Sequence, residues 1–306
     1  LILRHLQRVF PILKKCGYTC ELWGDMLIET DNTSVTAQEV KKCIPDDALV
    51  FLWDYMENDE EKLLGMIENM QKYCKHVAFA GGVWKYIGFG PCNRYSISRI
   101  IPQMKACYEK EIGHYMVTLW SDNVARCSVD AALPSLYVAA EYANGNYDGT
   151  GVLDKEKFYN ITGVRYDDML SLDHIDDPLK TNHGNRSSSS FWVFYTDLLL
   201  GNFDLFLTAG IEKVYAARAE EFAALKGGNY GHVFAMSESV MRVLAIKAPL
   251  PAMIRSAYAR LRAFIDRGEK IDELEGGVLP INYEPKPTPD SSCMVDYRML
   301  ISYCIQ

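Results

Sequence analysis

Short apolar runs alternate with stretches of helical periodicity from residue 1 to about residue 143, and this alternation limits the possible folds. Strands are predicted at residues 18–23, 48–53, 76–80 and 115–120. Helices are predicted at residues 2–15, 36–43, 58–74, 96–113 and 128–142, with Gly17 as the C-cap of the first and Ser96 as the N-cap of the fourth. Strands that are each followed by a helix form βαβ units, whose strands lie parallel. We therefore predict an α/β fold.

Two architectures fit these four units, an open four-stranded sheet and the C-terminal half of a (β/α)₈ TIM barrel, which needs eight. The aromatic residues favour the barrel. Each predicted strand ends at, or just before, a tryptophan, and polar residues accompany most of them: Trp23 with Asp25, Trp53 with Asp54 and Tyr55, Trp84, and Trp120 with Asp122. Active sites of (β/α)₈ enzymes lie at this end of the strands. Indole faces pack on sugar rings and carboxylates accept bonds from hydroxyls, so the pattern predicts a carbohydrate site.

The second part of the chain has a different periodicity. Helices are predicted at residues 154–172, 191–207, 211–225, 237–246 and 251–266, with few candidate strands among them. We predict a partial TIM-barrel catalytic domain at residues 1–145, an all-α C-terminal domain at 146–284 and an irregular tail at 285–306. A half barrel would have two open strand edges, which folded proteins rarely tolerate, so we expect the chain made alone to aggregate or to need its other half.

Composition excludes several classes of protein. The formal net charge of -8 argues against a nucleic-acid partner, because phosphates require a basic surface. No apolar run reaches the length that crosses a bilayer, so no membrane partner is predicted. The nine cysteines show no zinc-binding spacing; Cys16 and Cys20 are predicted to be buried, reduced thiols, which favours a cytoplasmic protein. Neither a metal nor an organic cofactor is predicted.

The first residues also suggest a truncated sequence. The chain begins at Leu1, without a methionine, inside an amphipathic helical stretch. We therefore expect it to be the C-terminal fragment of a longer protein.

Four motifs resemble those of the family 20 glycoside hydrolases, the exo-β-N-acetylhexosaminidases, in the branch that has a helical C-terminal domain. They lie at residues 21–26 (ELWGDM), 51–55 (FLWDY), 79–85 (FAGGVWK, with Gly88 and Phe89) and 117–123 (VTLWSDN). The resemblance is specific over about residues 18–143 and looser to about residue 283. It is absent from the final segment. It implies a hydrolase that removes terminal β-linked N-acetylglucosamine or N-acetylgalactosamine from a glycan.

The resemblance implies a substrate-assisted, retaining mechanism, in which the 2-acetamido oxygen of the sugar attacks C1. In this family an Asp orients the acetamido N–H and the adjacent Glu protonates the leaving oxygen. Tyr55 matches the tyrosine whose hydroxyl bonds the acetamido oxygen, and is the predicted catalytic residue. The predicted substrate-binding residues are Trp23, Asp25, Trp53, Asp54, Trp84, Trp120, Asp122 and Asn123.

These residues have different expected roles. Trp53, Trp84 and Trp120 would form the walls of the pocket, and Asp122 would accept hydrogen bonds from the outer hydroxyls of the terminal sugar. Asn123 would reach the same hydroxyls or stabilise a turn. Trp23 and Asp25 would border the pocket, although Asp25 is equally suited to capping the following loop.

One departure from the family pattern affects the chemistry. The family's Asp-Glu pair ends a strand that precedes the one with Trp23, and this chain has no such pair there. Asp59 and Glu60 follow Tyr55 at a predicted helix start, where the helix dipole favours acids. We therefore expect the chain alone to be inactive. Two alternatives are a non-catalytic carbohydrate-binding protein and a different TIM-barrel glycosidase, with its acid and base among Asp25, Asp54 and Asp122.

Overall fold

A parallel sheet forms the first part of the computed structural model, which describes residues 2–28, 36–121, 126–146, 153–180, 188–201 and 206–266. The four strands pair in the order of the sequence, β1-β2-β3-β4, and every pair is parallel. They are β1 (Glu21–Trp23), β2 (Leu49–Trp53), β3 (His76–Gly82) and β4 (Tyr115–Thr118). The predicted α/β fold is confirmed, and a sequential parallel order is consistent with part of a barrel.

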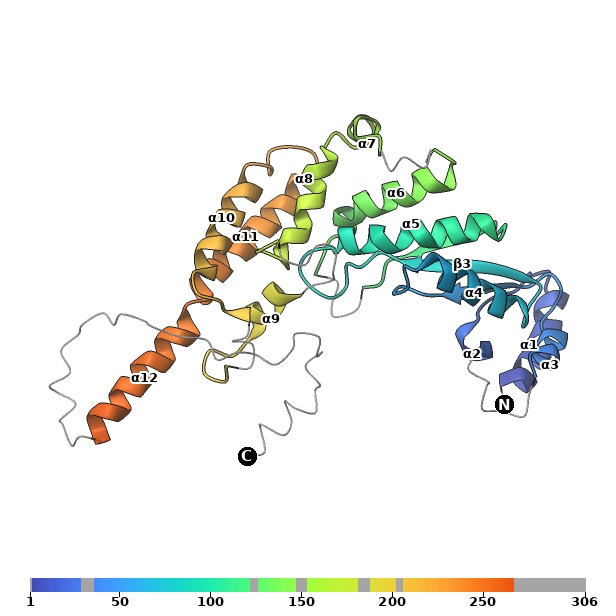
Figure 1. The fold of residues 1–306 in the computed structure, drawn as a ribbon, viewed down its shortest axis with the longest axis horizontal. Helices are drawn as coiled ribbons and strands as arrows, with labels where there is room; N and C mark the ends of the chain where they lie inside the picture. Colours follow the sequence, from blue (N-terminus) through green and yellow to red (C-terminus); the bar gives the residue numbers. More distant parts are fainter. Residues whose placement is uncertain are drawn as a thin grey trace.

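Helices pack against this sheet (Figure 1). They are α1 (Ile2–Lys15), α2 (Asp25–Ile28), α3 (Ala37–Cys43), α4 (Glu60–Gln71), α5 (Asn93–Glu109) and, after the 3₁₀ turn η2 (Val129–Ala132), α6 (Leu133–Ala143). Val50 and Leu52 of β2 and Val77 and Phe79 of β3 pack with α1, α3, α4 and α5 in one buried cluster. The alternate strand positions, among them Phe51, belong to the other face.

Local chemistry explains where several of these helices begin and end. Thr36 and Glu39 form a capping box at the start of α3. The Asp59 side chain accepts the backbone N–H of Lys62 at the start of α4, as the sequence predicts for an acid in that position. Gly17, at φ +80°, follows the end of α1 in the left-handed conformation that a C-cap needs.

Two expectations for this region are wrong. Ser96 does not cap α5, because the helix begins at Asn93 and the Ser96 hydroxyl lies inside its first turn, bonded to Cys92 O and accepting Trp84 N–H. Cys16 is exposed, because it falls in the turn after α1 rather than on the apolar stripe, whereas Cys20 is buried. Strand β1 is also shorter than predicted, since only its last three residues pair with β2.

The second part of the described chain is helical, as predicted. Its elements are α7 (Lys155–Thr162), α8 (Tyr166–Leu170), η3 (Ser171–Ile175), α9 (Ser189–Tyr195), α10 (Ile211–Ala223), α11 (Gly231–Lys247) and α12 (Leu250–Asp266). The stretch predicted as one helix from 154 is broken at Gly163, which has φ +72°. The helix predicted at 191–207 ends at Tyr195. Helices α10 and α11 pack side by side, and α12 extends away from them (Figure 1).

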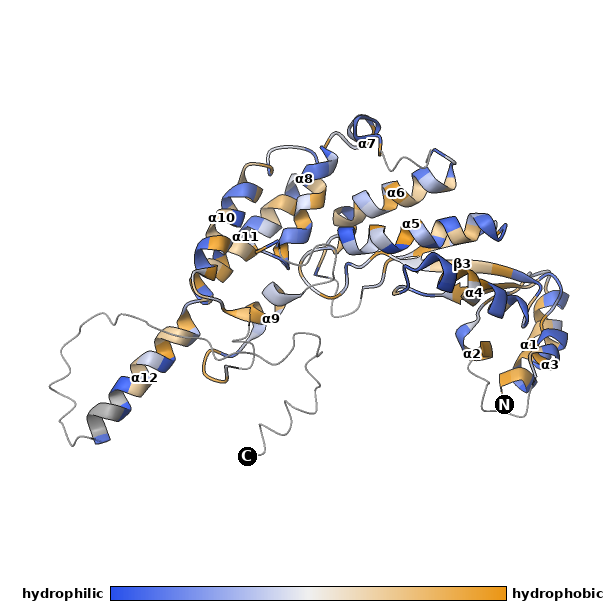
Figure 2. Cartoon of the chain, in the orientation of Figure 1, coloured by the Kyte–Doolittle hydropathy of each residue, from blue (hydrophilic) through white to orange (hydrophobic). Residues whose placement is uncertain are grey.

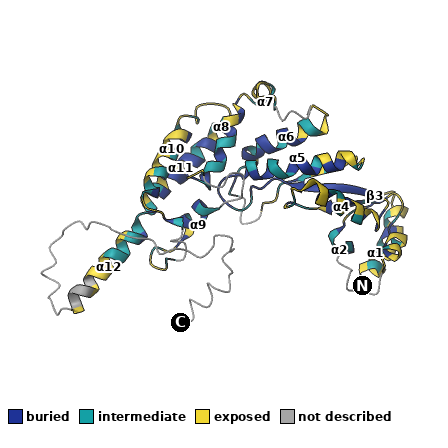
Figure 3. Ribbon diagram, in the orientation of Figure 1, coloured by how far each residue is buried: buried dark blue, intermediate teal, exposed yellow. Residues whose placement is uncertain are grey.

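One apolar core joins the two parts. Phe89, Cys127 and Tyr137 of the α/β region belong to the same buried cluster as Phe158 and Phe234 of the helical region. Figure 2 shows apolar residues on the sheet and on helix faces that meet other elements, and Figure 3 shows buried residues continuing across both parts. The predicted domain boundary near residue 145 stays a prediction, and the predicted tail at 285–306 lies outside the described residues. In the described part of the chain, no helix has the length and apolar character needed to span a bilayer.

Two carboxylates from the helical region contribute polar contacts to this junction. Asp173 accepts the backbone N–H groups of Asn93 and Arg94 at 2.9 and 2.8 Å, which satisfies the N-terminus of α5. Asp176 is 1% exposed and accepts the N–H groups of Gly90 at 2.8 Å and Phe191 at 3.1 Å. Burial raises the pKa of Asp176 to about 7, although these N–H donors act in the opposite sense.

The raised pKa of Asp176 predicts how stability depends on pH. The carboxyl holds its proton to higher pH in the folded chain than in the unfolded one, where the ordinary value is 3.8. The folded state therefore binds more protons between about pH 4 and pH 7, and the free energy of unfolding falls as pH rises through that window. We expect Asp176→Asn to lose less stability than the wild type between about pH 5 and pH 8 in urea unfolding. Parallel pH profiles for the two proteins would contradict this assignment.

Candidate functional site

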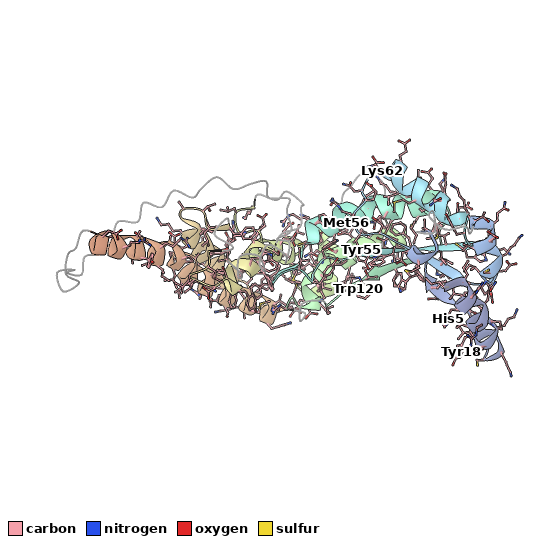
Figure 4. All side chains as sticks on the ribbon, turned by 90° about the horizontal axis from the view of Figure 1, so that it is seen from below. His5, Tyr18, Tyr55, Met56, Lys62 and Trp120 are labelled. Carbon is pink, nitrogen blue, oxygen red and sulfur yellow. The ribbon has the colours of Figure 1, made fainter. Side chains whose placement is uncertain are left out.

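Five aromatic residues gather at the carboxyl ends of the strands. We call Trp23, Trp53, Tyr55, Trp84 and Trp120 the aromatic rim. Ring centroids are 5.9 Å apart for Trp23 and Trp53, 5.4 Å for Trp53 and Tyr55, and 6.5 Å for Tyr55 and Trp84. Trp120 reaches the same group through its indole N–H, which donates to Tyr55 Oη at 2.5 Å. Figure 4 shows Tyr55 and Trp120 close together, far from His5 and Tyr18 at the N-terminal end.

The rim has an exposed part and a buried part. Trp23, Trp53 and Trp120 are 40%, 43% and 40% exposed, whereas Tyr55 and Trp84 are buried. Large aromatic side chains normally lose most of their surface on folding. These three partly exposed indoles, linked through Trp53 and Tyr55, form an apolar surface suited to a ligand. The parallel register explains the proximity, because Trp23 pairs with Phe51, and Trp53 with Ala80, on the sheet face opposite the helices.

Two glycines at the end of β3 make room for the centre of the rim. A Cβ on Gly82 would lie 2.7 Å from the Tyr55 ring, so the ring can rest on β3 only because this position has no side chain. On the other face, a Cβ on Gly81 would lie 2.0 Å from the hydroxyl of Tyr115. The Gly-Gly pair in the 79–85 motif therefore allows side chains to approach β3 closely from both sides.

The Tyr55 hydroxyl belongs to a short chain of hydrogen bonds. Besides accepting from Trp120, it lies 2.5 Å from Thr118 Oγ1, and Thr118 Oγ1 lies 3.0 Å from the carbonyl oxygen of Gly81. The threonine has one proton and the carbonyl only accepts. When Thr118 donates to Gly81 O, its oxygen can accept the hydrogen bond of the Tyr55 hydroxyl. When Thr118 donates to Tyr55 Oη, the Tyr55 O–H is available to donate to another acceptor. The hydroxyl oxygen is thus held in place, while its O–H can donate either to Thr118 or to another acceptor.

Helix α5 fixes the segment that contains Tyr55. Gln103, which is fully buried, donates to the carbonyl oxygens of Asp54 and Glu57 on either side of Tyr55. The Tyr115 hydroxyl in turn donates to Gln103 Oε1 at 2.9 Å, and burial raises the pKa of Tyr115 far above its ordinary value, so it remains a neutral donor. The amide nitrogen of Gln103 therefore holds the loop between β2 and α4, while its amide oxygen is bonded to Tyr115 of β4.

The predicted acidic residues are distributed unevenly around the rim. Asp54 is half-buried, and its Oδ1 accepts the backbone N–H groups of Met56 and Glu57 at 2.9 and 2.7 Å, so one carboxylate oxygen is already used in a turn. Asp25 is the first residue of the short helix α2, where the helix dipole favours an acid. Asp122 and Asn123 lie outside the described residues. The binding roles of all four stay predictions.

Sequence reasoning missed the residues that support the rim rather than form it. Thr118, Gln103 and Gly82 each contact Tyr55 or its loop, yet none has a distinctive spacing from it. The only available signals were that Thr118 and Gly82 lie within the matching motifs. Among the described residues, no group of three or more His, Cys, Asp or Glu side chains could hold a metal ion.

A comparison with known families is consistent with this geometry. Residues 167–261, from within α8 to within α12, match the family model described as the Glycoside Hydrolase 20C C-terminal domain. The match indicates a protein related to glycoside hydrolase family 20, and it confirms the resemblance from the part of the chain where the motifs are weakest. No curated protein matches the chain.

The close approach at Gly82 predicts the effect of a methyl group there. In Gly82→Ala the new Cβ would overlap the Tyr55 ring, so the ring or the strand must move, at a cost of about 1–3 kcal/mol in the free energy of unfolding. Gly113→Ala is the matched control, because a Cβ there has no neighbour within 4 Å. Thermal unfolding of both variants checks this. Equal melting temperatures would show that Tyr55 does not rest on β3.

Proposed function

We propose that this chain supplies the aromatic walls and the acetamido-orienting tyrosine of an exo-β-N-acetylhexosaminidase that uses the substrate-assisted, retaining mechanism. The observation that supports it best is Tyr55, which contacts the three indoles of Trp53, Trp84 and Trp120 at the carboxyl ends of parallel strands. The match of the helical region to a domain of family 20 hydrolases supports the same assignment. The substrate class is a glycan with a terminal β-linked N-acetylhexosamine.

The chemistry requires a hydroxyl that can donate to the acetamido oxygen. That oxygen becomes the nucleophile, and it must be held in line with C1 while positive charge spreads from C1 into the new ring. Tyr55 can do this when Thr118 turns its proton towards Tyr55 Oη, since both phenolic lone pairs then accept, from Thr118 and Trp120, and the phenolic proton is free for the sugar. Two accepted hydrogen bonds also polarise the O–H and strengthen its donation.

The exposed indoles suit the rest of the sugar. The flat faces of Trp23, Trp53 and Trp120 are accessible, and a pyranose ring has an apolar C–H side that packs on such faces. Trp84 is buried against Tyr55 and would form the inner wall, next to the N-acetyl methyl group. Polar partners for the sugar hydroxyls would come from Asp25, Asp122 and Asn123.

The carboxylates of the described residues do not offer the adjacent acid pair of this mechanism. Asp54 Oδ1 accepts two backbone N–H groups, Asp59 caps α4, and Glu60 pairs with Lys105 at 3.1 Å. We therefore propose that the Asp-Glu pair comes from barrel strands outside this chain. Those strands would continue the sheet at the edges formed by β1 and β4, which have no further partner strand among the described residues.

Kinetics on the complete protein test the proposed function. We expect the full-length polypeptide that contains this sequence to cleave an aryl N-acetyl-β-glucosaminide or galactosaminide, and residues 1–306 alone to be inactive. Activity of residues 1–306 would show that the acid lies within them. Binding of N-acetylglucosamine in calorimetry without turnover of either substrate would instead identify a non-catalytic carbohydrate-binding protein.

The phenolic hydroxyl of Tyr55 gives a sharper test in the active full-length protein. Tyr55→Phe should lower kcat on the order of 10²–10³-fold, because it removes the donor that positions and stabilises the reacting acetamido group. The ring remains to pack on Gly82, so far-UV circular dichroism should not change. A different glycosidase, with its acid and base among Asp25, Asp54 and Asp122, would keep most of its activity in Tyr55→Phe and lose it when one of these acids is replaced.

Thr118 provides a matched pair of variants for the hydrogen-bond chain. Thr118→Val has nearly the same shape but no hydroxyl, and should lower kcat about 10-fold through the loss of one bond to Tyr55 Oη, with little effect on KM. Thr118→Ser keeps the hydroxyl and should retain near wild-type kcat. Equal kcat values for the valine and serine variants would remove Thr118 from the proposed mechanism.

A further inference from the structure

The helical region contacts the loop that follows β3, which carries Trp84 of the aromatic rim. This loop runs from Trp84 to Asn93 and closes on itself, since Cys92 N–H donates to Trp84 O at 2.7 Å. The backbone N–H of Trp84 donates to Ser96 Oγ at 2.9 Å, which fastens the base of the loop to α5. The Trp84 ring stacks on Tyr86 of the same loop, with centroids 4.8 Å apart.

The tip of the loop is held by Asp176. Its carboxylate accepts Gly90 N–H at 2.8 Å, and Gly88 passes so close that a Cβ there would lie 2.1 Å from Asp176 Oδ2. Both Asp176 and the loop glycines are buried, so water does not compete for these bonds. Asp173, three residues earlier, caps the start of α5, where the loop ends. Two carboxylates of one short segment therefore hold both ends of the Gly88–Asn93 stretch.

Aromatic contacts also join this loop to the helical region. Phe89 packs against Phe191 and Phe194 of α9, with centroids 5.5 and 5.0 Å apart. The guanidinium of Arg126, in the segment after β4, lies 4.9 Å from the centre of the Phe191 ring. Helix α9 thus contacts the segments that follow both β3 and β4, the strands whose ends are nearest to Trp84 and Trp120.

We propose that Asp176, with Asp173, is a positioning residue of the site: the two carboxylates hold the Trp84–Asn93 loop so that Trp84 stands against Tyr55. This inference uses the sugar site of the proposed function and adds a role for the helical region, which is to fix one wall of that site. A misplaced wall of the order of 1 Å costs about 10²-fold in kcat/KM.

The environment of Trp84 is the first measurement, and it needs no substrate. Asp176→Asn keeps the shape but offers only one acceptor oxygen to the N–H groups of Gly90 and Phe191. We expect acrylamide to quench Trp84 in this variant and not in the wild type, with the Trp84 contribution taken as the difference from the same protein bearing Trp84→Phe. Asp167→Asn is the control, since Asp167 is exposed in the same region and its carboxylate pairs with Lys155.

A second variant breaks the contact from the loop side. Gly88→Ala leaves the helical region unchanged and places a methyl group against the Asp176 carboxylate, so it should release Trp84 as Asp176→Asn does. This variant decides the question if Asp176→Asn loses its far-UV signal. Trp84 that stays protected in a folded Gly88→Ala protein, or in a folded Asp176→Asn protein, overturns the proposal.

Kinetics of the full-length enzyme are the second measurement. Asp176→Asn and Gly88→Ala should lower kcat/KM for an aryl N-acetylhexosaminide on the order of 10²-fold, while Asp167→Asn should not. Variants that melt at lower temperature but keep wild-type kcat/KM and a protected Trp84 would show a merely structural role. If the wild-type enzyme proves inactive on these substrates, the proposed function fails, and the quenching experiment still decides whether Asp176 holds the loop.

Discussion

Helix α5 is the element on which the arrangement of the site depends. In its first turn, Ser96 Oγ accepts the backbone N–H of Trp84. In its third turn, Gln103 donates to the carbonyl groups that flank Tyr55. Helix α5 therefore holds two loops, the one that follows β2 and the one that follows β3, in a fixed position relative to each other. The N-terminus of that helix is satisfied by Asp173 of the helical region rather than by a cap of its own. The position of the aromatic residues is therefore set by contacts between parts of the chain that are far apart in sequence.

The strands and most helices could be predicted because their signals are local. The short continuous apolar run at 48–53 is typical of a buried parallel strand, and Thr36 and Asp59 are side chains that cap the helix beginning next to them. Errors arose where a remote partner replaced a local one. Serine is a common N-cap residue, but Asp173, about eighty residues away, accepts the N–H groups at the start of α5. The Ser96 hydroxyl accepts the backbone N–H of Trp84 instead. The helix break at Gly163 was not predicted, because a single glycine also occurs inside continuous helices.

The site shows the same division. Trp23 and Trp53 end strands, and Tyr55 and Trp120 lie two residues after the ends of β2 and β4. A parallel sheet brings strand ends together, so the proximity of these residues was predictable from position alone. The contacts that each of these side chains makes with its neighbours were not predictable in this way. The turn that occupies Asp54 Oδ1, the glycine that admits the Tyr55 ring and the threonine that orients its hydroxyl are facts of three-dimensional packing. Periodicity indicates which face a residue occupies, but not which neighbour it meets there.

The further barrel strands of the proposed function would account for two features of the described chain. The sheet presents β1 and β4 as its edges, and open edges of a parallel sheet are rarely left uncovered. Under the proposed function the aromatic rim would hold an acetylated sugar, but the described residues bring to it no unoccupied pair of adjacent carboxylates that would protonate the leaving group. Strands that pair with these edges would close the barrel and would bring their own carboxyl ends to the same rim. We infer that completion of the fold and completion of the chemistry are a single event, because in a closed barrel every strand end faces one mouth.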